Sequence, residues 1–169
     1  METNSIIFFR SEVYPDPPSK PVVAAWNMKN PGNIGSLIRV LDNVGGTELF
    51  LLDDENPKRE SQIRKTAGLS YDHVRVHRVS GEWFFRNLPE DYSVCAVETS
   101  TGSENIFLTG LPQKIIFLVG NEMHGLPVAF LKKCNQVVHI PMTGACKSMN
   151  VSHALAVILF EWLRKQLFS

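Results

Sequence analysis

The chain has 169 residues, which is enough for one domain with a full hydrophobic core and does not suggest a second domain. Its 17 lysines and arginines balance its 17 aspartates and glutamates, so the formal net charge is zero at pH 7. A purely electrostatic grip on a polyanion is therefore not indicated by the overall charge. Three local basic clusters remain, and each is either a solvated face or a patch that binds a nucleic-acid backbone. They are Lys58, Arg59, Arg64 and Lys65; Arg75 and Arg78; and Lys132 and Lys133.

Cysteine and histidine spacing argues against disulfides and metals. The three cysteines, Cys95, Cys134 and Cys146, are odd in number and lack metal-type spacing, which predicts free thiols in a reducing compartment. No histidine grouping has ligand-like spacing, so we expect no metal. The longest late apolar run, residues 154–160, is too short to cross a bilayer, and the N-terminus lacks the pattern of a targeting signal. We therefore expect a cytoplasmic protein that does not bind a membrane.

The order of elements predicts an α/β protein. Residues 1–21 contain four prolines near their end and are expected to form an N-terminal arm before a single domain at 22–169. Apolar β-branched runs then alternate with helical patterns, which indicates a mainly parallel sheet covered by helices on both faces. The expected strands are 22–26, 49–52, 74–77, 94–97, 115–119 and 137–140, and the expected helices are 37–44, 61–67, 82–87 and 127–133.

The last segment carries the strongest helical pattern in the chain. One stripe facing either the core or a second subunit is predicted for Val151, Leu155, Ile158, Leu159, Trp162 and Leu163.

A glycine-containing motif follows the first expected strand. Gly32 and Gly35 bracket Asn33 and Ile34 in an expected turn before the helix that carries Arg39. Glycines allow a ligand to approach the backbone, and a helix N-terminus offers unpaired N–H groups. We expect Asn33 and Arg39 to reach the space above the strand ends, although an ordinary turn with Arg39 in solvent fits the same pattern. The glycine spacing fits neither a Walker phosphate loop nor a dinucleotide fingerprint.

Two further motifs lie near strand ends in the last third of the chain. Gly120-Asn121-Glu122 follows the apolar strand 115–119, where the carboxylate is placed to accept from backbone N–H groups or a ribose hydroxyl. A capping role for Glu122 fits equally well. Ser148 and Asn150 precede the last helix, where both residue types are common caps.

Taken together, the Asn33–Arg39 motif, Gly120-Asn121-Glu122 with Gly125-Leu126, and Ile140-Pro141-Met142 with Ser148-Met149-Asn150 resemble the SpoU-type RNA ribose 2′-O-methyltransferases of the SPOUT class. The resemblance extends from about Val22 to Lys165 and fits the compact, TrmH-like members that lack an added RNA-binding domain. It implies a C-terminal deep trefoil knot in the α/β fold. It also implies a homodimer whose site lies near the subunit interface.

The family further implies S-adenosylmethionine as cofactor, with S-adenosylhomocysteine as product, bound by loops at 98–102, 119–122 and 140–151. The catalytic residues carried over by motif position are Arg39, Asn33, Glu122, Ser148 and Asn150. The cofactor-binding residues are Thr99, Ser100, Gly120, Asn121, Glu122, Ile140, Met142, Ser148, Met149 and Val151, with Met149 standing where the family usually has leucine.

The role of Arg39 has two versions, because a guanidinium normally stays protonated. Its surroundings make it basic, or it stabilises the developing alkoxide while another group or water takes the proton. The predicted function is methyl transfer to a ribose 2′-hydroxyl of structured RNA, with tRNA favoured over rRNA. The alternatives are an rRNA enzyme, a non-catalytic knotted RNA-binding protein, a flavodoxin-like nucleotide-binding protein, and a base methyltransferase of the same class.

Overall fold

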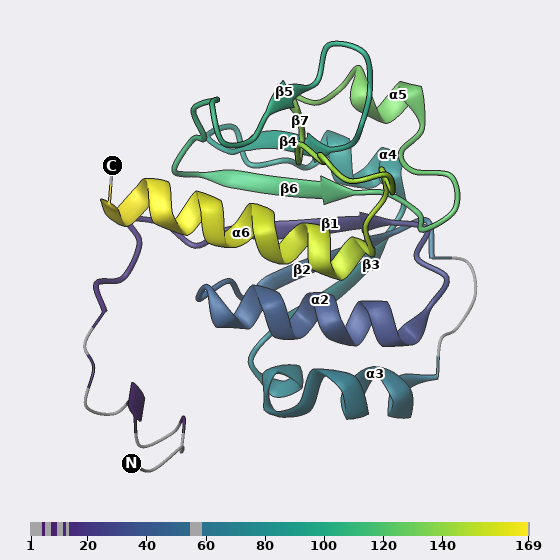
Figure 1. The fold of residues 1–169 in the computed structure, drawn as a ribbon. Coiled ribbons are helices and arrows are strands. Elements are labelled where there is room, and N and C mark those ends of the chain that lie inside the picture. Colours follow the sequence, from purple (N-terminus) through teal and green to yellow (C-terminus); the bar gives the residue numbers. More distant parts are fainter. Residues whose placement is uncertain (1–4, 6–7, 10–11, 13, 55–58, 169) are drawn as a thin grey trace.

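A computed structural model describes residues 5, 8–9, 12, 14–54 and 59–168. Within this part of the chain, seven parallel strands form one sheet with the order β3-β2-β1-β6-β4-β7-β5 (Figure 1). The sheet confirms the expected α/β architecture. The strands are β1 (Val22–Trp26), β2 (Glu48–Leu52), β3 (Arg75–Val79), β4 (Ser93–Val97), β5 (Glu104–Asn105), β6 (Ile115–Val119) and β7 (Gln136–His139).

One face of the sheet is covered by α2 (Pro31–Asn43) and α6 (Val151–Phe168), which lie side by side, with α3 (Glu60–Ala67) packed on the outer side of α2 (Figure 1). A 3₁₀ helix, η1 (Gly68–Asp72), links α3 to β3. The core on this face contains fully buried side chains from strands and helices alike, such as Phe117, Leu37 and Trp162. Burial of this apolar surface is the main force that holds the two helices on the sheet.

The opposite face is covered by α4 (Gly81–Arg86) and the short α5 (Val128–Leu131). Phe84 of α4 packs with Leu52 and Leu118 of the strands, and Phe130 of α5 stands edge-on to Trp26 at 6.0 Å between ring centroids. The central strand β6 is buried at every position, because it contributes side chains to both cores. A continuous apolar run is the expected signature of such a strand.

Helix α2 begins at Pro31, six residues before the start predicted from the sequence. Asn30 is its N-cap and accepts a hydrogen bond from Gly32 N at 2.8 Å, while Pro31 occupies the first turn. The expected glycine turn at 32–35 is therefore wrong, since these residues lie inside the helix. A Cβ on Gly35 would lie 2.6 Å from Ile63 O, so this glycine allows α3 to pack closely rather than a ligand to approach.

The last helix packs against its own domain. Leu155, Ile158, Leu159 and Trp162 are fully buried, and Trp162 Nε1 donates to Pro112 O at 2.9 Å. This resolves the choice that the sequence left open, because the predicted stripe faces the core. A different stripe of α6 faces solvent, and it includes Phe160 with half of its surface exposed.

The remaining differences from the predicted elements are small. β3 begins one residue later than expected, and the two-residue edge strand β5 was not predicted because two residues carry no pattern. Lys58 of the first basic cluster lies outside the described residues, whereas Arg64, Arg75 and Arg78 pair with Asp72, Glu48 and Asp54. In the part of the chain that the structure describes, no helix combines the length and the apolar character needed to span a membrane.

Candidate functional site

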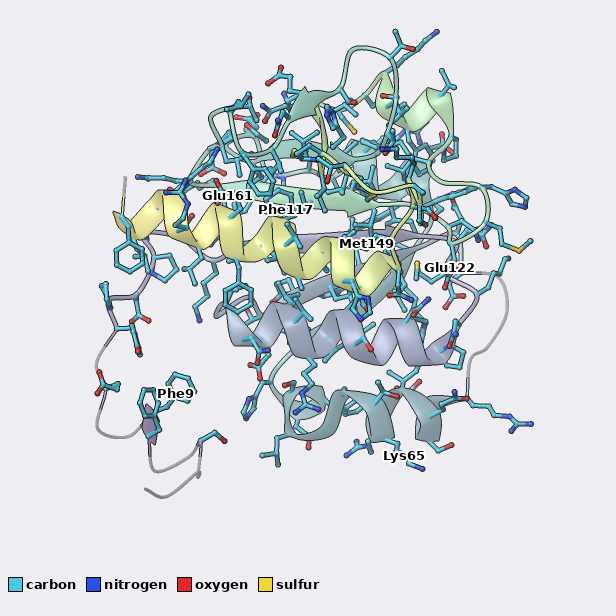
Figure 2. All side chains as sticks on the ribbon, viewed as in Figure 1. Phe9, Lys65, Phe117, Glu122, Met149 and Glu161 are labelled. Atoms are coloured by element: carbon cyan, nitrogen blue, oxygen red, sulfur yellow. The ribbon has the colours of Figure 1, made fainter. Side chains whose placement is uncertain are left out.

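A cavity of about 670 Å³ opens at the carboxyl ends of β1, β6, β4 and β7. These strands are neighbours in the sheet, so the loops that follow them meet above the carboxyl ends of the strands. Figure 2 shows Glu122 and Met149 on the same side of the molecule, near the start of α6. The lining residues are Lys29, Asn30, Asn33, Val97, Glu98, Thr99, Val119, Gly120, Asn121, Glu122, Met123, Gly125, His139, Ile140, Met142, Lys147, Ser148, Met149, Asn150, Val151 and Ala154.

Glu122 joins the loop after β6 to the beginning of α2. One carboxylate oxygen accepts from Asn33 Nδ2 at 2.9 Å and from Asn30 N at 3.1 Å, and the other accepts from Lys29 N at 3.2 Å. The carboxylate thereby satisfies backbone donors ahead of the helix that have no helical partner. The two segments are 89 residues apart in sequence.

Asn33 and Asn150 continue this network to the last helix. Asn33 Oδ1 accepts from Asn150 Nδ2 at 3.1 Å, and Asn150 Oδ1 accepts from Ser152 N at 2.9 Å and Ser152 Oγ at 2.7 Å. Asn150 is thus the N-cap of α6, as its residue type predicted. The Glu122 carboxylate only accepts, so it fixes the amide orientation of Asn33, and the Ser152 N–H only donates, so it fixes that of Asn150.

The charge state of Glu122 follows from its partners. Partial desolvation of the carboxylate opposes its ionisation, but hydrogen bonds from the Asn33 side chain and from backbone N–H groups, including those of Lys29 and Asn30, outweigh this effect. The pKa of Glu122 therefore lies below its ordinary value. At neutral pH the side chain is a carboxylate and a weak base.

The turn at 121–125 is held rigidly beside the network. Asn121 and Gly125 exchange backbone hydrogen bonds at 3.2 and 2.9 Å, and Asn121 Oδ1 accepts from Met123 N and His124 N. Asn121 Nδ2 donates to Asn27 O at 2.7 Å, which fixes the turn to the end of β1. Gly125 has a φ of 64°, a backbone conformation that favours glycine.

Glu98 connects the loop after β4 to this turn. Its carboxylate accepts from Leu126 N at 2.8 Å and from Thr99 N at 3.0 Å. The segment between β7 and α6 is held by its own contacts, with Lys147 Nζ donating to Met142 O at 2.7 Å. Nearby, the exposed thiol of Cys146 lies 3.6 Å from Ser148 Oγ, and hydrogen bonding with Ser148 lowers the pKa of Cys146.

The cavity brings together most of the residues that the sequence singled out. Asn33, Glu122, Ser148 and Asn150 line it, as do all of the expected cofactor-binding residues except Ser100. Ser100 lies in the adjoining turn, where its carbonyl accepts from Ser103 Oγ. In the described residues, no group of three or more histidine, cysteine, aspartate or glutamate side chains is placed to hold a metal ion.

Arg39 does not line this cavity, and its side chain is exposed on α2. The expectation that Asn33 and Arg39 both reach the space above the strand ends required a helix that starts between them, whereas α2 starts at Pro31. In this chain Arg39 follows the alternative, with its side chain in solvent. Six residues of α-helix separate two side chains by about 9 Å along the axis and about 120° around it. Asn33, which is 9% exposed, points toward the cavity, whereas Arg39 points elsewhere.

Sequence reasoning left Lys29, Asn30 and His139 out of the site, and it included Glu98 only as the first residue of an expected cofactor-binding loop. Lys29 and Asn30 follow the end of β1, and Asn30-Pro31 is a common helix-start signal that would have moved the helix and its cap toward the cavity. Glu98 and His139 lie at the ends of β4 and β7. Their positions at strand ends were the available signal.

The chain is similar to known proteins whose names describe RNA 2′-O-methyltransferases. The chain is 30% identical over 142 residues to the 23S rRNA (guanosine-2′-O-)-methyltransferase RlmB of Haemophilus influenzae, covering 83% of this chain and 58% of that protein. It is 28% identical over 149 residues to the tRNA (guanosine(18)-2′-O)-methyltransferase of Aquifex aeolicus, covering 86% of this chain and 69% of that protein. The chain thus spans somewhat over half of the length of the H. influenzae relative.

A solved structure agrees with these relatives. The AdoMet-bound rRNA methyltransferase from Sinorhizobium meliloti superposes with a TM-score of 0.81 at 26% identity, covering 93% of this chain and 60% of the other. Residues 20–160 match the SpoU rRNA Methylase family. The match covers most of the chain and includes all three motifs. The chain therefore belongs to the SpoU rRNA methylase family, whose membership implies the knotted SPOUT form of the α/β fold.

Proposed function

We propose that this protein transfers a methyl group from S-adenosylmethionine to a ribose 2′-hydroxyl of RNA. The observation that carries the proposal is the hydrogen-bonded series Glu122–Asn33–Asn150, in which one side chain from each of three distant motifs meets at one cavity. The named activities of the H. influenzae and A. aeolicus relatives support the same reaction class.

The cavity fits a cofactor of this size and chemistry. Its volume of about 670 Å³ lies within the range of roughly 300–1,000 Å³ found for small-molecule sites. Its walls combine apolar side chains such as Val97, Ile140 and Val151 with polar groups at four neighbouring strand ends. This mixture suits an adenine ring, a ribose and an amino acid end. When bound, S-adenosylmethionine supplies an electrophilic methyl group on a sulfonium.

The reaction forms an O–C bond to the ribose and breaks the S–C bond, while the proton of the hydroxyl leaves. Glu122 is a poor acceptor for that proton, because its pKa is lowered and its oxygens already accept three hydrogen bonds. We assign Glu122, Asn33 and Asn150 to hold the loops in the reactive geometry, with Ser148 at the cavity wall. The exposed guanidinium of Arg39 is assigned to stabilise the developing alkoxide, with water accepting the proton.

We propose a homodimer because Arg39 lies outside the cavity of its own chain. A second copy that packs against the outer surface of α2 and α6 would bring its own Arg39 to the cavity of the first. The exposed stripe of α6 contains Phe160, half exposed, and the partly buried Val157, which offers apolar surface for such a contact. A two-fold interface uses the same patch on both copies.

For the substrate, we propose structured tRNA, with rRNA as the alternative. The chain covers 69% of the A. aeolicus tRNA enzyme but 58% of the H. influenzae rRNA enzyme, so the compact tRNA relative is matched more fully. We keep 22–169 as the methyltransferase domain and 1–21 as an arm, supported by the start of β1 at Val22. The free thiols of Cys95, Cys134 and Cys146 support a reducing cytoplasm as the compartment.

The test is transfer of labelled methyl groups from S-adenosylmethionine to bulk tRNA and, separately, to rRNA, each lacking the modification, followed by nucleoside analysis. We expect 2′-O-methylated nucleosides with the parent protein and none with Arg39→Ala, while Arg86→Ala, on the far face, retains activity. Cofactor binding without transfer to either RNA would instead favour the non-catalytic RNA-binding alternative. A methylated base would favour the base methyltransferase.

A further inference from the structure

His139 ends β7 and lines the cavity at the edge farthest from α2. Its position is fixed by its backbone, because its carbonyl accepts from Ile106 N at 3.1 Å. Its ring is fixed by one side chain, since Nδ1 lies 2.9 Å from Ser103 Oγ. Both side chains are partly buried. The imidazole is therefore held at a defined place in the cavity wall.

The hydrogen bonds of Ser103 determine which ring nitrogen carries the proton. Ser103 Oγ lies 2.7 Å from Ser100 O, and a carbonyl only accepts, so the single hydroxyl proton points there. Ser100 N also donates to Ser103 Oγ at 3.4 Å. With its proton committed, Ser103 Oγ accepts from His139 Nδ1–H. Neutral His139 thus has a bare lone pair on Nε2.

Nε2 of His139 makes no hydrogen bond to any other residue that the structure describes. We infer that His139 is a positioning residue whose Nε2 accepts a hydrogen bond from an N–H or O–H group of the adenosine part of S-adenosylmethionine. This inference rests on the proposed function. It gives a binding role to a side chain that the proposed function leaves without one.

The sheet order indicates why the adenosine part belongs at this end. Strands β6 and β4 separate β1 from β7, so three strand spacings, roughly 14 Å, lie between the two ends of the cavity. Asn33 and Glu122 gather at the β1 end, and the proposed function places the reacting ribose hydroxyl beside them. If the methionine end of the cofactor lies beside the same residues, the adenosine part, on the other side of the sulfonium, lies toward β7. Its available donors are the exocyclic amine of adenine and the two ribose hydroxyls.

The test measures S-adenosylhomocysteine binding by calorimetry for the parent protein, His139→Asn and the control His153→Asn on the exposed side of α6. Asparagine places an N–H donor near the position of Nδ1, so it retains the Ser103 bond but has no group at Nε2. We expect roughly three- to tenfold weaker binding for His139→Asn and parental binding for the control. His139→Gln, whose amide oxygen extends to the Nε2 position, should recover part of the loss.

Ser103→Ala provides a second variant that leaves the imidazole in place. It removes the acceptor for Nδ1–H, so the ring is free to carry its proton on Nε2, and weaker binding is expected again. Thermal unfolding of each variant shows whether the fold is retained. If His139→Asn folds and binds like the parent protein, His139 serves only to hold the loop and the inference is wrong.

Cofactor analogues identify the donor atom. One analogue replaces the adenine amine with a carbonyl oxygen, and two others lack the 2′- or the 3′-hydroxyl. For the analogue that lacks the donor, the parent protein and His139→Asn should have equal affinities. For the other two analogues, the parent protein should bind more tightly. If their affinity ratio is the same for all three analogues as for S-adenosylhomocysteine, no adenosine donor contacts Nε2. If the parent protein binds no S-adenosylhomocysteine at all, the proposed function fails and this inference fails with it.

Discussion

Asn33 has one permitted amide orientation, because a carboxylate holds its nitrogen and an amide donor holds its oxygen. Asn33→Asp replaces the donor with a second acceptor and places a carboxylate beside Glu122. We expect a loss of about 1–3 kcal/mol in the free energy of unfolding, measured by urea titration, and loss of methyl transfer. Asn43→Asp, at the exposed C-terminal residue of the same helix, is the control and should lose less than about 1 kcal/mol, the cost of a negative charge at that helix end.

Glu122 makes stability depend on pH in a predictable direction. Its pKa is lowered in the folded state, against desolvation, by its hydrogen bonds with Asn33 and with backbone N–H groups. A group with a depressed folded pKa contributes its stability above the unfolded pKa and loses it as pH falls through the folded pKa. The parent protein should therefore lose stability relative to Glu122→Gln as pH falls below about 5.

Urea midpoints measured for both proteins between about pH 6 and pH 3.5 provide the comparison. The difference between the two midpoints should shrink steadily toward acid. A difference that stays constant across this range would show that the ionisation of Glu122 is not coupled to folding.

At the scale of single residues, the sequence predicted a role correctly where a residue type in a given position has few structural roles. An asparagine or serine before an apolar helical run predicts a cap, and Asn150 is one. The sequence offered two directions for Arg39, toward the strand ends or into solvent, and could not decide between them because the direction depends on where α2 begins. Nor could it anticipate the His139–Ser103 contact, which joins residues 36 positions apart.

At the scale of elements, α2 and α3 pack unusually closely at Gly35. A Cβ there would lie 2.6 Å from Ile63 O and 2.7 Å from Thr66 Cβ. Gly35→Ala should therefore destabilise the protein by about 1–3 kcal/mol, despite a gain in helix propensity of roughly 1 kcal/mol. Urea unfolding measures the change, with Ser36→Ala as the matched control on the next residue. Equal or greater stability in Gly35→Ala would show that the helices separate at little cost.

The strands were predicted more accurately than the helices for a physical reason. β1 and β6 are apolar runs with sharp polar boundaries, and both expected ranges match the structure. Helix α2 begins with Pro31-Gly32, two residues that disfavour helix interiors but are tolerated in a first turn capped by Asn30. Local propensity therefore pointed to a loop, while the cap and the packing of Gly35 decided the outcome.

For the whole molecule, we expect a second copy of the chain to complete the site by supplying Arg39. Arg39→Ala and Asn150→Ala should each be inactive alone. If Arg39 acts in the partner's cavity, a mixed dimer has one cavity with both defects and one with neither. After subunit exchange, about a quarter of the parental activity should return, because half of the dimers are mixed and each has one intact site. Methyl transfer by the mixture measures this.

No recovery by a mixture that light scattering shows to be dimeric would place Arg39 in the cavity of its own chain. A monomeric parent protein would contradict the proposed homodimer itself. Phe160→Glu, on the exposed stripe of α6, tests the surface separately. It should weaken dimer formation and leave the fold intact.

The place of β6 also constrains how the protein matures. β6 lies between β1 and β4, yet the ribosome makes it after both of them. A nascent chain that has emerged only as far as β4 lacks the strand that joins the two halves of the sheet, so its edges stay exposed until residue 119 leaves the exit tunnel. Helix α6, whose cap residue Asn150 completes the network at the cavity, follows later still. Translation that stalls before this helix therefore yields a chain without a working site, and chaperone protection is most needed in that interval.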